Sequence, residues 1–299
     1  MNKKRTYFIK WLFRRTLAKV NQILCFFLPE SRVKTINARW YFKRKINIEH
    51  PQKLNEKILW MEYNTDASLR SRLTDKYEVR QYVAKKGYEE CLVPLFGIYG
   101  SPDEINIEDI PEQFVLKATH GCDMNYICRK KEDTDIRDLQ RRMKMWMKIN
   151  TAYVSLEMHY RTISPRIICE KYIESGDNPL TDYKIHCSDG KARFILVCSY
   201  GHGKRYLDVF SRSWEHLPVV VGAEENPDRP CRPEQLEEMC VMAENLAEGI
   251  PFVRIDLYTV GHKVYFGEMT FTPATGVLFH FSDEFLMEEG KYCTIVPSD

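Results

Sequence analysis

Apolar positions recur at helical spacing in three parts of this chain. Residues 1–65 keep that spacing and are predicted to be helical. Asp75 can cap a further helix that runs to Lys86, where Gly87 provides a stop signal. Residues 134–160 also have a strongly helical pattern. Because they carry no candidate chemistry, we interpret them as scaffold.

Short apolar runs mark the predicted strands, most of which lie after Pro165. One helix, at 233–248, interrupts this second part of the chain. The predicted strands cover residues 92–99, 114–118, 166–172, 182–186, 192–199, 205–210, 252–258 and 263–271. Since strands outnumber helices here, the pattern indicates an α+β protein.

The length and composition are those of a globular protein. The chain has 299 residues, enough for one large domain or two to three small ones, and is 44% hydrophobic and 29% charged. Its net charge of +2 conceals an asymmetry, because residues 1–50 hold thirteen Lys or Arg and only two Glu. A basic arm suggests an anionic surface, either membrane headgroups or a polyanionic polymer. A solvated, lysine-rich helix is the alternative.

Residues 7–28 mix large apolar and basic side chains, as does a helix that lies in a membrane interface. Packing of this segment against the rest of the protein is the preferred account. No stretch approaches the ~18 to 20 apolar residues of a spanning helix, and residues 23–28 lack the cleavage site of a signal peptide. We therefore expect a cytoplasmic protein, with peripheral contact at the inner face of the membrane as a further possibility.

The ten cysteines are scattered, with neither a C-x-x-C pair nor paired histidine spacing. Zinc is therefore not expected. Several cysteines lie in apolar, strand-like runs, a position typical of reduced thiols in a core.

The strongest candidate for chemistry is a pair of strands near the C-terminus. Alternation along 253–258 puts Arg254 and Asp256 on one face. A turn at 259–262 returns the chain antiparallel, so that Glu268 can lie opposite Asp256. Two carboxylates repel unless a cation lies between them, and Mg²⁺ bridging phosphates suits oxygen ligands. A surface Arg–Asp pair beside an unrelated Glu is the alternative.

Lys117 is a second candidate, because it ends a predicted buried strand and precedes small and hydroxyl residues. A buried ammonium must find an anion. Phosphate fits, with N–H groups of residues 119–125 as further donors. A lysine that extends into solvent is the alternative.

A third candidate is the strand that leads to Glu170, with Asp182 and Lys184 after it. Its apolar-then-polar run suits a hinge that pairs with an adenine edge, and an acidic residue beyond it can bind ribose hydroxyls. Taken alone, the segment is only a strand and a turn.

The order of these segments is more specific than any one of them. The relevant motifs are Asn55-Glu-Lys57, Asp75-Lys-Tyr-Glu-Val-Arg80, Val115-Leu-Lys-Ala-Thr-His-Gly121, Asp182-Tyr-Lys184, Arg254-Ile-Asp256, Phe266-Gly-Glu268 and Thr270-Phe-Thr-Pro273. In this order, from about Pro51 to Lys291, the chain resembles the TupA-like branch of the ATP-grasp superfamily. That branch is associated with the biosynthesis of teichuronopeptide and other cell-surface polysaccharides.

The resemblance implies an ATP-grasp fold, in which two α+β subdomains clasp ATP, behind a helical basic N-terminal extension. Lys117 would contact the α-phosphate with help from Arg80, a loop over 119–126 would close over the other phosphates, and Asp182 would lie near the ribose. The implied nucleotide-binding residues are Arg80, Lys117, Thr119, His120, Gly121, Glu170, Lys171, Tyr172, Ile173 and Asp182.

The resemblance also implies roles for the C-terminal strands. Lys184 would face phosphate, and Arg254 would stabilise an acyl-phosphate transition state. Asp256 and Glu268 would hold magnesium. The superfamily usually has Asn where this chain has Thr270, and a hydroxyl is a weaker ligand than an amide carbonyl.

The implied organisation is a basic arm at 1–50, an N-terminal subdomain at 51–113 and the ATP-grasp catalytic region at 114–299. The implied activity is that of a carboxylate–amine ligase, which joins an amino acid to a sugar acid, either free or linked to a polymer. A glycosyltransferase that uses a sugar nucleotide and a non-catalytic carbohydrate-binding protein are the alternatives. No nucleic-acid partner is expected.

Overall fold

The computed structural model describes residues 3–174 and 180–295, which fall into two compact units. Each unit combines three separate stretches of the chain. Unit 1 contains Met1–Lys34, Ala67–Val79 and Val93–Ile173. Unit 2 contains Thr35–Asp66, Arg80–Leu92 and Glu174–Asp299. The two units thus alternate along the sequence. The resemblance implies a different division, into consecutive ranges that meet at residues 50 and 113, and that division stays a prediction.

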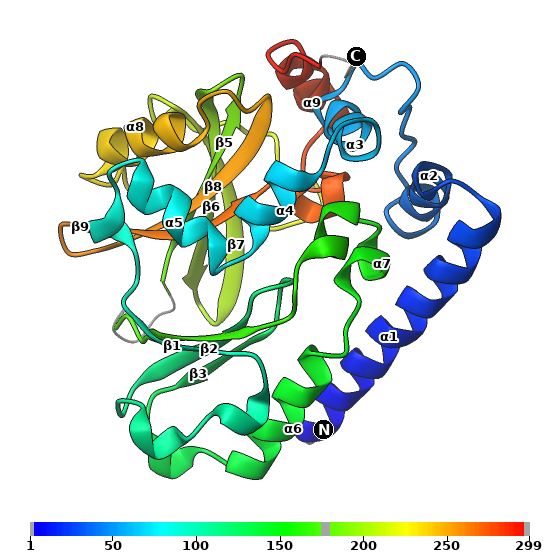
Figure 1. The fold of residues 1–299 in the computed structure, drawn as a ribbon. Helices are drawn as coiled ribbons and strands as arrows, with labels where there is room; N and C mark the ends of the chain where they lie inside the picture. Colours follow the sequence, from blue (N-terminus) through cyan, green and yellow to red (C-terminus); the bar gives the residue numbers. More distant parts are fainter. Residues whose placement is uncertain (1–2, 175–179, 296–299) are drawn as a thin grey trace. The chain divides into compact units, whose positions relative to one another are not determined.

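Unit 1 contains an antiparallel sheet with strand order β1-β4-β2-β3 (Figure 1). Its strands are β1 (Leu95–Tyr99), β2 (Phe114–Ala118), β3 (Asn125–Cys128) and β4 (Ile167–Lys171). Alternation along β2 buries Phe114, Leu116 and Ala118 in the core. The resemblance implies a phosphate loop over 119–126, but Asn125 and Tyr126 at its end belong to β3 and pair with β2.

The helices of unit 1 are α1 (Lys3–Phe27), α4 (Ser68–Thr74), α6 (Ile136–Trp146) and α7 (Thr151–Ser155), with a 3₁₀ turn at Met158–Thr162. Helices α1, α6 and α7 pack on that core, whereas α4 contacts the 3₁₀ turn. The prediction of one helical run over 134–160 is wrong at its centre. Helix α6 buries Leu139, Met143 and Trp146 and ends at Trp146. Helix α7 ends before Leu156, whose backbone is left-handed with φ of 57°.

Unit 2 contains a five-stranded antiparallel sheet with strand order β7-β6-β5-β8-β9. Its strands are β5 (Asp182–Ser188), β6 (Lys191–Gly201), β7 (Lys204–Ser211), β8 (Phe252–Val260) and β9 (Lys263–Thr270). Helix α8 (Leu236–Leu246) covers one face, and α3 (Leu54–Asn64) and α9 (Asp283–Gly290) lie on the other (Figure 1). The predicted strands and the α+β class are confirmed.

Two helices, α2 (Glu30–Tyr41) and α5 (Glu78–Lys85), contribute residues to both units. The predicted signals at the ends of α5 are confirmed. The Asp75 carboxylate accepts hydrogen bonds from the backbone N–H groups of Tyr77 and Glu78, and Gly87 has φ of +88°.

All ten cysteines are free thiols, as the sequence predicts. In the part of the chain that the structure describes, no helix combines the length and the apolar character needed to cross a membrane.

Candidate active site

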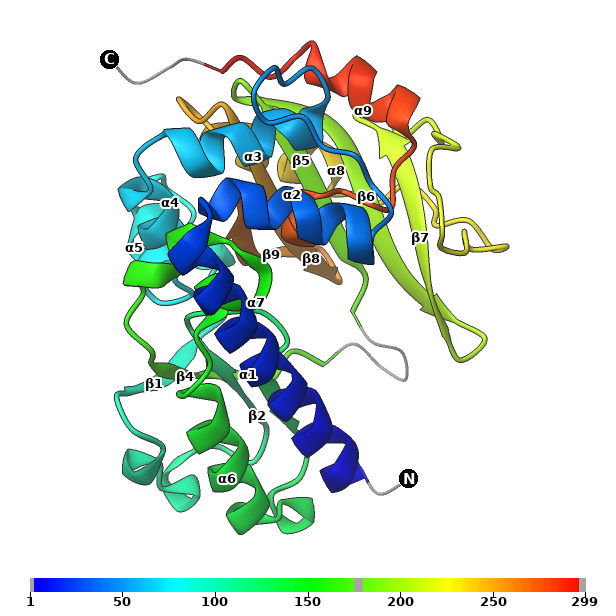
Figure 2. The ribbon, with the colours of Figure 1, turned by 90° about the vertical axis from the view of Figure 1, so that its right-hand side faces the viewer.

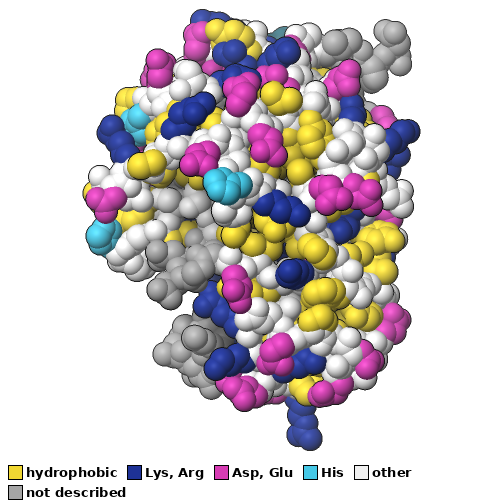
Figure 3. Space-filling model, turned by 90° about the vertical axis from the view of Figure 1, so that its left-hand side faces the viewer, with side chains coloured by type: hydrophobic (Ala, Val, Ile, Leu, Met, Phe, Trp, Pro, Cys, Tyr) yellow, Lys and Arg dark blue, Asp and Glu magenta, His cyan; other side chains and the backbone are white. Residues whose placement is uncertain are grey.

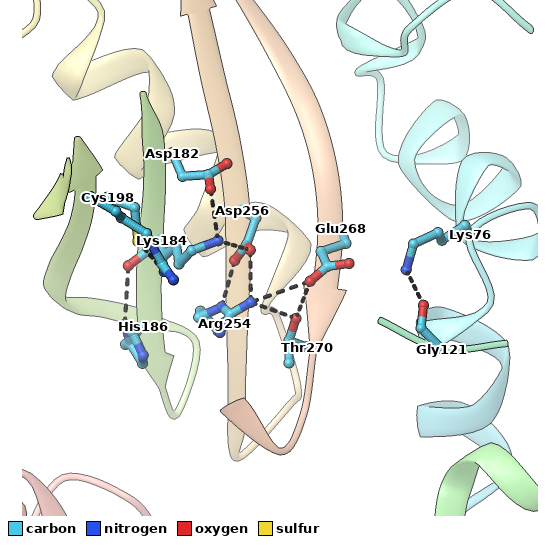
Figure 4. A network of polar contacts seen from close by, with 11 residues as sticks. Lys76, Gly121, Asp182, Lys184, His186, Cys198, Arg254, Asp256, Glu268 and Thr270 are labelled. Atoms are coloured by element: carbon cyan, nitrogen blue, oxygen red, sulfur yellow. Dashed lines mark hydrogen bonds and ion pairs between the residues drawn. The ribbon is translucent and has the colours of Figure 1, made fainter. Parts of the chain in front are cut away.

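Three neighbouring strands of unit 2 present polar side chains on one face of the sheet (Figure 4). Lys184 on β5 lies opposite Asp256 on β8, which lies opposite Glu268 on β9. The next row contains His186, Arg254 and Thr270 on the same three strands. The predicted pairing of Asp256 with Glu268 is therefore present, within a polar array of two rows.

A bulge in β9 produces this pairing. From Val260 back to Leu257 the register is regular, with Leu257 opposite Phe266. Asp256 then pairs with Glu268, so Gly267 is the extra residue. Without the bulge, Glu268 would project from the opposite face of the sheet. A Cβ on Gly267 would lie only 2.9 Å from the carbonyl oxygen of Asp256, so only glycine fits there without a shift of the backbone.

Asp256 is the centre of the array and is 2% exposed. Its Oδ1 accepts a hydrogen bond from Arg254 Nε at 2.6 Å. Its Oδ2 accepts from Arg254 Nη2 at 2.7 Å and from Lys184 Nζ at 2.6 Å. A carboxylate can be buried here because two cations compensate its desolvation. The alternative of a surface Arg–Asp pair is wrong, since Asp256 is inside the protein.

Glu268 is the accessible carboxylate of the array, with 30% of its side chain exposed. Its Oε1 accepts hydrogen bonds from Arg254 Nη2 at 3.3 Å and from Thr270 Oγ1 at 3.1 Å. Arg254 Nη2 also donates to Thr270 Oγ1 at 3.0 Å. Arg254 thus links both carboxylates and the hydroxyl.

The buried groups of the array influence each other's protonation. Burial lowers the pKa of the Lys184 ammonium, but the combined attraction of Asp256 and Asp182 outweighs burial and raises that pKa. Burial and the nearby Asp256 raise the pKa of Asp182, against the effect of Lys184 3.4 Å away. Burial and the positive charges of Arg254 and Lys184 hold the pKa of His186 well below its usual value. Its ring is therefore neutral, with Nδ1 3.0 Å from the carbonyl oxygen of Lys184.

The donor chemistry of the array fits magnesium. Asp256 and Glu268 supply hard carboxylate oxygens and Thr270 a hydroxyl, which are the ligand types that Mg²⁺ prefers. Three carboxylates lie together here, since Asp182 and Asp256 pair with Lys184, and Asp256 and Glu268 pair with Arg254. Among the described residues no group of three or more acidic, His or Cys side chains is arranged to hold a metal. A bound Mg²⁺ would thus need phosphate and water to complete its coordination.

In unit 1, Lys117 lies near Glu170. Lys117 Nζ is 2.7 Å from Glu170 Oε2, across the paired strands β2 and β4. The lysine side chain is 23% exposed and that of the glutamate 7%. The prediction that Lys117 pairs with an anion is confirmed, and the anion in this structure is the carboxylate of Glu170.

The loop after Lys117 is closely tied to its surroundings. Thr119 is bound through its backbone N–H to the carbonyl oxygen of Arg166 at 3.0 Å. His120 is buried, with Nε2 3.1 Å from the carbonyl oxygen of Trp146, and burial lowers the pKa of its ring. A Cβ on Gly121 would lie 2.5 Å from Met124 Cε and 2.7 Å from Thr151 Oγ1. Met124 and Thr151 therefore leave no room for a side chain at Gly121.

The other predicted nucleotide-binding residues are less enclosed. Lys171 is exposed at the end of β4, where its backbone N–H donates to the carbonyl oxygen of Pro94 at 2.9 Å. Tyr172 and Ile173 are half-buried, and the guanidinium of Arg129 lies 5.6 Å from the Tyr172 ring centre. Arg80 is half-buried on α5 and belongs to unit 2. The predicted residues are therefore divided between the two units, and their binding roles stay predictions.

Sequence reasoning missed two cations that hold unit 1 together. Lys76 donates from Nζ to the carbonyl oxygen of Gly121 at 3.1 Å (Figure 4). Arg166 Nη2 binds Asp75 Oδ2 and Glu78 Oε1, both at 2.8 Å. Lys76 lies inside one of the quoted motifs, so that motif was the available signal. Nothing local to Arg166 pointed to partners some ninety residues away in sequence.

Comparisons with known proteins agree with this architecture. The sequence model of the family described as TupA-like ATPgrasp matches residues 56–293. Because this match covers most of the chain, the protein belongs to the TupA-like ATP-grasp family. A search of curated proteins found no match.

Solved structures with similar folds include several ligases. D-alanine–D-alanine ligase from Helicobacter pylori is 13% identical with a TM-score of 0.46, covering 85% of this chain and 71% of that one. The ATP complex of the Bacillus anthracis enzyme is also 13% identical, with a TM-score of 0.43 and coverage of 76% and 64%. D-cycloserine synthetase DcsG is 14% identical, with a TM-score of 0.42 and coverage of 80% and 77%.

Proposed function

We propose that this protein is an ATP- and Mg²⁺-dependent carboxylate–amine ligase that uses the polar array of β5, β8 and β9. The observation that carries the proposal is the hydrogen-bonded set of Asp256, Arg254 and Glu268 on one face of the sheet. Membership of the TupA-like ATP-grasp family supports ATP as the substrate.

The charges of the array explain why a divalent cation is needed. Asp182, Asp256 and Glu268 outnumber Lys184 and Arg254 by one charge when all are ionised. A site with net negative charge repels the phosphates of ATP. Mg²⁺, held by Asp256 and Glu268, would reverse that sign and neutralise charge on the phosphates.

The reaction proceeds in two transfers. An oxygen of the acceptor carboxylate attacks the γ-phosphorus, the bond to the bridging oxygen breaks, and ADP leaves with that oxygen. The amine nitrogen then attacks the acyl carbon, phosphate leaves, and the nitrogen loses a proton to give the amide. Both steps build negative charge on oxygen, so positioned cations and N–H donors must supply the catalysis.

In this proposal, Arg254 and Lys184 supply that stabilisation. Arg254 makes its hydrogen bonds through Nε and Nη2, and within the described residues Nη1 has no partner. Lys184 Nζ carries three protons, of which one is directed at Asp256 at 2.6 Å. Asp256 thus orients both cations, while each keeps a donor for a transferring phosphoryl group.

The family points to the substrate class. We propose that the acceptor is a sugar acid and the nucleophile the amine of an amino acid, joined during synthesis of a cell-surface polysaccharide. The support for this finer assignment is the TupA-like family match.

The proposal is tested by measuring ADP release with uronic-acid acceptors and amino acids. Glu268→Ala should lower kcat by about 10²- to 10³-fold, because it removes a group that acts on the transferring charge. The matched control is Glu248→Ala, since Glu248 is an exposed acidic residue of unit 2 paired with Lys86. Equal turnover by the parent and Glu268→Ala would contradict the role of this carboxylate. A thermal shift with UDP-sugars but none with Mg·ATP would contradict ATP as the substrate.

A further inference from the structure

Helix α1 has one face that packs against unit 1. Trp11 Nε1 donates to the carbonyl oxygen of Met145 at 2.9 Å, and Asn21 Nδ2 donates to that of Tyr153 at 2.8 Å. Ala18, on the same side of the helix, is buried. The preferred prediction, that this segment packs on the protein, is confirmed for this face.

The opposite face of α1 is apolar and exposed. Successive residues are about 100° apart around a helix, so this face lies across from Trp11, Ala18 and Asn21. Phe13 and Ile23 are each 62% exposed and Phe27 is 74% exposed. The exposed apolar residues of α1, here called the apolar stripe, are Phe8, Ile9, Leu12, Phe13, Val20, Ile23, Leu24, Phe26 and Phe27. Figure 2 shows α1 running along unit 1 beside α6, and α1 also contacts α7.

The charge of α1 is of one sign. The helix contains seven Lys or Arg and no Asp or Glu. Lys10 and Lys19 are exposed at the two edges of the apolar stripe, where their alkyl chains can lie along it. By contrast, the face drawn in Figure 3 intermixes acidic and basic side chains.

A basic row on α6 continues this surface. Arg137, Arg141, Lys144 and Lys148 follow one another at intervals of four, three and four residues, which places them on one side of the helix and of the turn after it. With Trp11, Gln140 and Met145 they line a hollow of about 360 Å³. Trp11 lines this hollow, and its ring centre lies 5.7 Å from that of Phe8, a residue of the apolar stripe. The Arg15 guanidinium lies 4.8 Å from the Trp11 ring centre.

The basic row has spare positive charge. Arg141 pairs with Asp138, and Lys144 Nζ lies 2.6 Å from Asp103. Within the described residues, Arg137 and Lys148 have no ion-pair partner. Two cations are therefore available to an external anion.

We propose that unit 1 docks on an anionic lipid bilayer, with the apolar stripe in the headgroup region and the basic row on lipid phosphates. A helix of this kind lies in the plane of the interface, and basic residues strengthen its binding to anionic lipid. A soluble polyanion would use the charges but leave the apolar stripe in water. A second copy would bring seven like charges against seven. The proposal does not depend on the ligase reaction.

The test is co-sedimentation of the full chain with vesicles of phosphatidylcholine, alone or mixed with phosphatidylglycerol. The parent should bind the mixed vesicles and release them at high salt. Phe13→Glu with Ile23→Glu should weaken binding by tenfold or more, about 1.4 kcal/mol. Arg137→Ala with Lys148→Ala should weaken it by about thirtyfold. Ile127→Glu on β3 is the matched control, because Ile127 is also an exposed apolar residue of unit 1.

Three outcomes would overturn the proposal. The first is no binding by the parent, or equal binding to both kinds of vesicle. The second is self-association of the parent without lipid, seen by light scattering and lost in the Phe13/Ile23 variant, which would assign the apolar stripe to a second copy. The third is binding to dextran sulfate but not to vesicles, which would assign the basic row to a polymer. Circular dichroism of each variant verifies that it is folded.

Discussion

The two faces of the five-stranded sheet use the same strands for opposite purposes. On β8, Arg254 and Asp256 join the polar array, while Val253, Ile255 and Leu257 between them are fully buried. Asp256 is buried almost as deeply, at 2% exposed, but hydrogen bonds between charges replace apolar packing around it. The comparison teaches that alternation along a strand such as β8 puts the polar array on one face and apolar residues on the other.

Removing the centre of the polar face should have the largest effect. Asp256→Asn leaves Arg254 and Lys184 buried without their carboxylate, so the free energy of unfolding should fall by about 3 to 5 kcal/mol, and turnover should be lost. Urea unfolding followed by circular dichroism measures the change. Asp228→Asn is the control, since Asp228 is an exposed carboxylate paired with His202. A variant as stable as the parent would show that the buried pairs do not hold this face together.

The bulge at Gly267 in β9 should be nearly as sensitive to substitution. Gly267→Ala puts a Cβ against the carbonyl oxygen of Asp256 and the Tyr258 ring, which should cost about 1 to 3 kcal/mol of stability and displace Glu268. Gly201→Ala in β6 is the control, because a Cβ there meets Tyr206 at an ordinary 3.7 Å. Thermal unfolding and ADP release measure both effects. Unchanged activity in Gly267→Ala would mean that the bulge does not position Glu268.

The pH dependence of stability distinguishes the charged face from the apolar one. Burial holds the pKa of His186 well below its usual value of about 6.5, so the unfolded chain binds a proton there that the folded chain does not. Stability should be fully present above pH 6.5 and decline as the pH falls below it. His186→Phe keeps the stacking on Phe194 and should reduce the slope by up to about 1.4 kcal/mol per pH unit.

This slope is measured by urea unfolding between about pH 5 and 7. Burial also lowers the pKa of His120 and of His280, so the variant should keep part of the dependence. An identical slope in the parent and in His186→Phe would contradict a neutral, buried His186.

The apolar face should respond in stability alone, and least of all. Ile255→Val removes one buried methylene group and should cost about 0.5 to 1.5 kcal/mol. Because Ile255 projects away from Asp256, kcat/KM for ADP release should stay at the parental value. A loss of turnover without a matching loss of stability would show that the two faces are not separate.

How much of this site was predictable depends on the range of the interactions. The shared face of Arg254 and Asp256 follows from strand periodicity, which is local. The pairing of Asp256 with Glu268 was predicted through a turn over residues 259–262. The strands in fact continue to Val260 and restart at Lys263, and the bulge at Gly267 restores the pairing. Periodicity does not reveal a one-residue bulge, although a glycine beside the acidic residue was its visible sign.

Interactions between segments that are distant in the sequence could not be predicted from it. The contact of Lys184 with Asp256 joins residues 72 positions apart, and the pair of Lys117 and Glu170 likewise depends on strand order. The break in the helical run 134–160 is likewise not visible in helix propensity. Helix α6 ends at Trp146, although Ile149 after it is buried in the same core.

The central claim is that the polar face of β5, β8 and β9 binds nucleotide through magnesium, and calorimetry tests it most directly. ATP is titrated into the parent and into Glu268→Gln, with and without Mg²⁺. The account predicts that Mg²⁺ strengthens ATP binding to the parent, and that Glu268→Gln loses at least about tenfold of that gain, or 1.4 kcal/mol. Equal Mg²⁺-dependent affinity in the two proteins would contradict it.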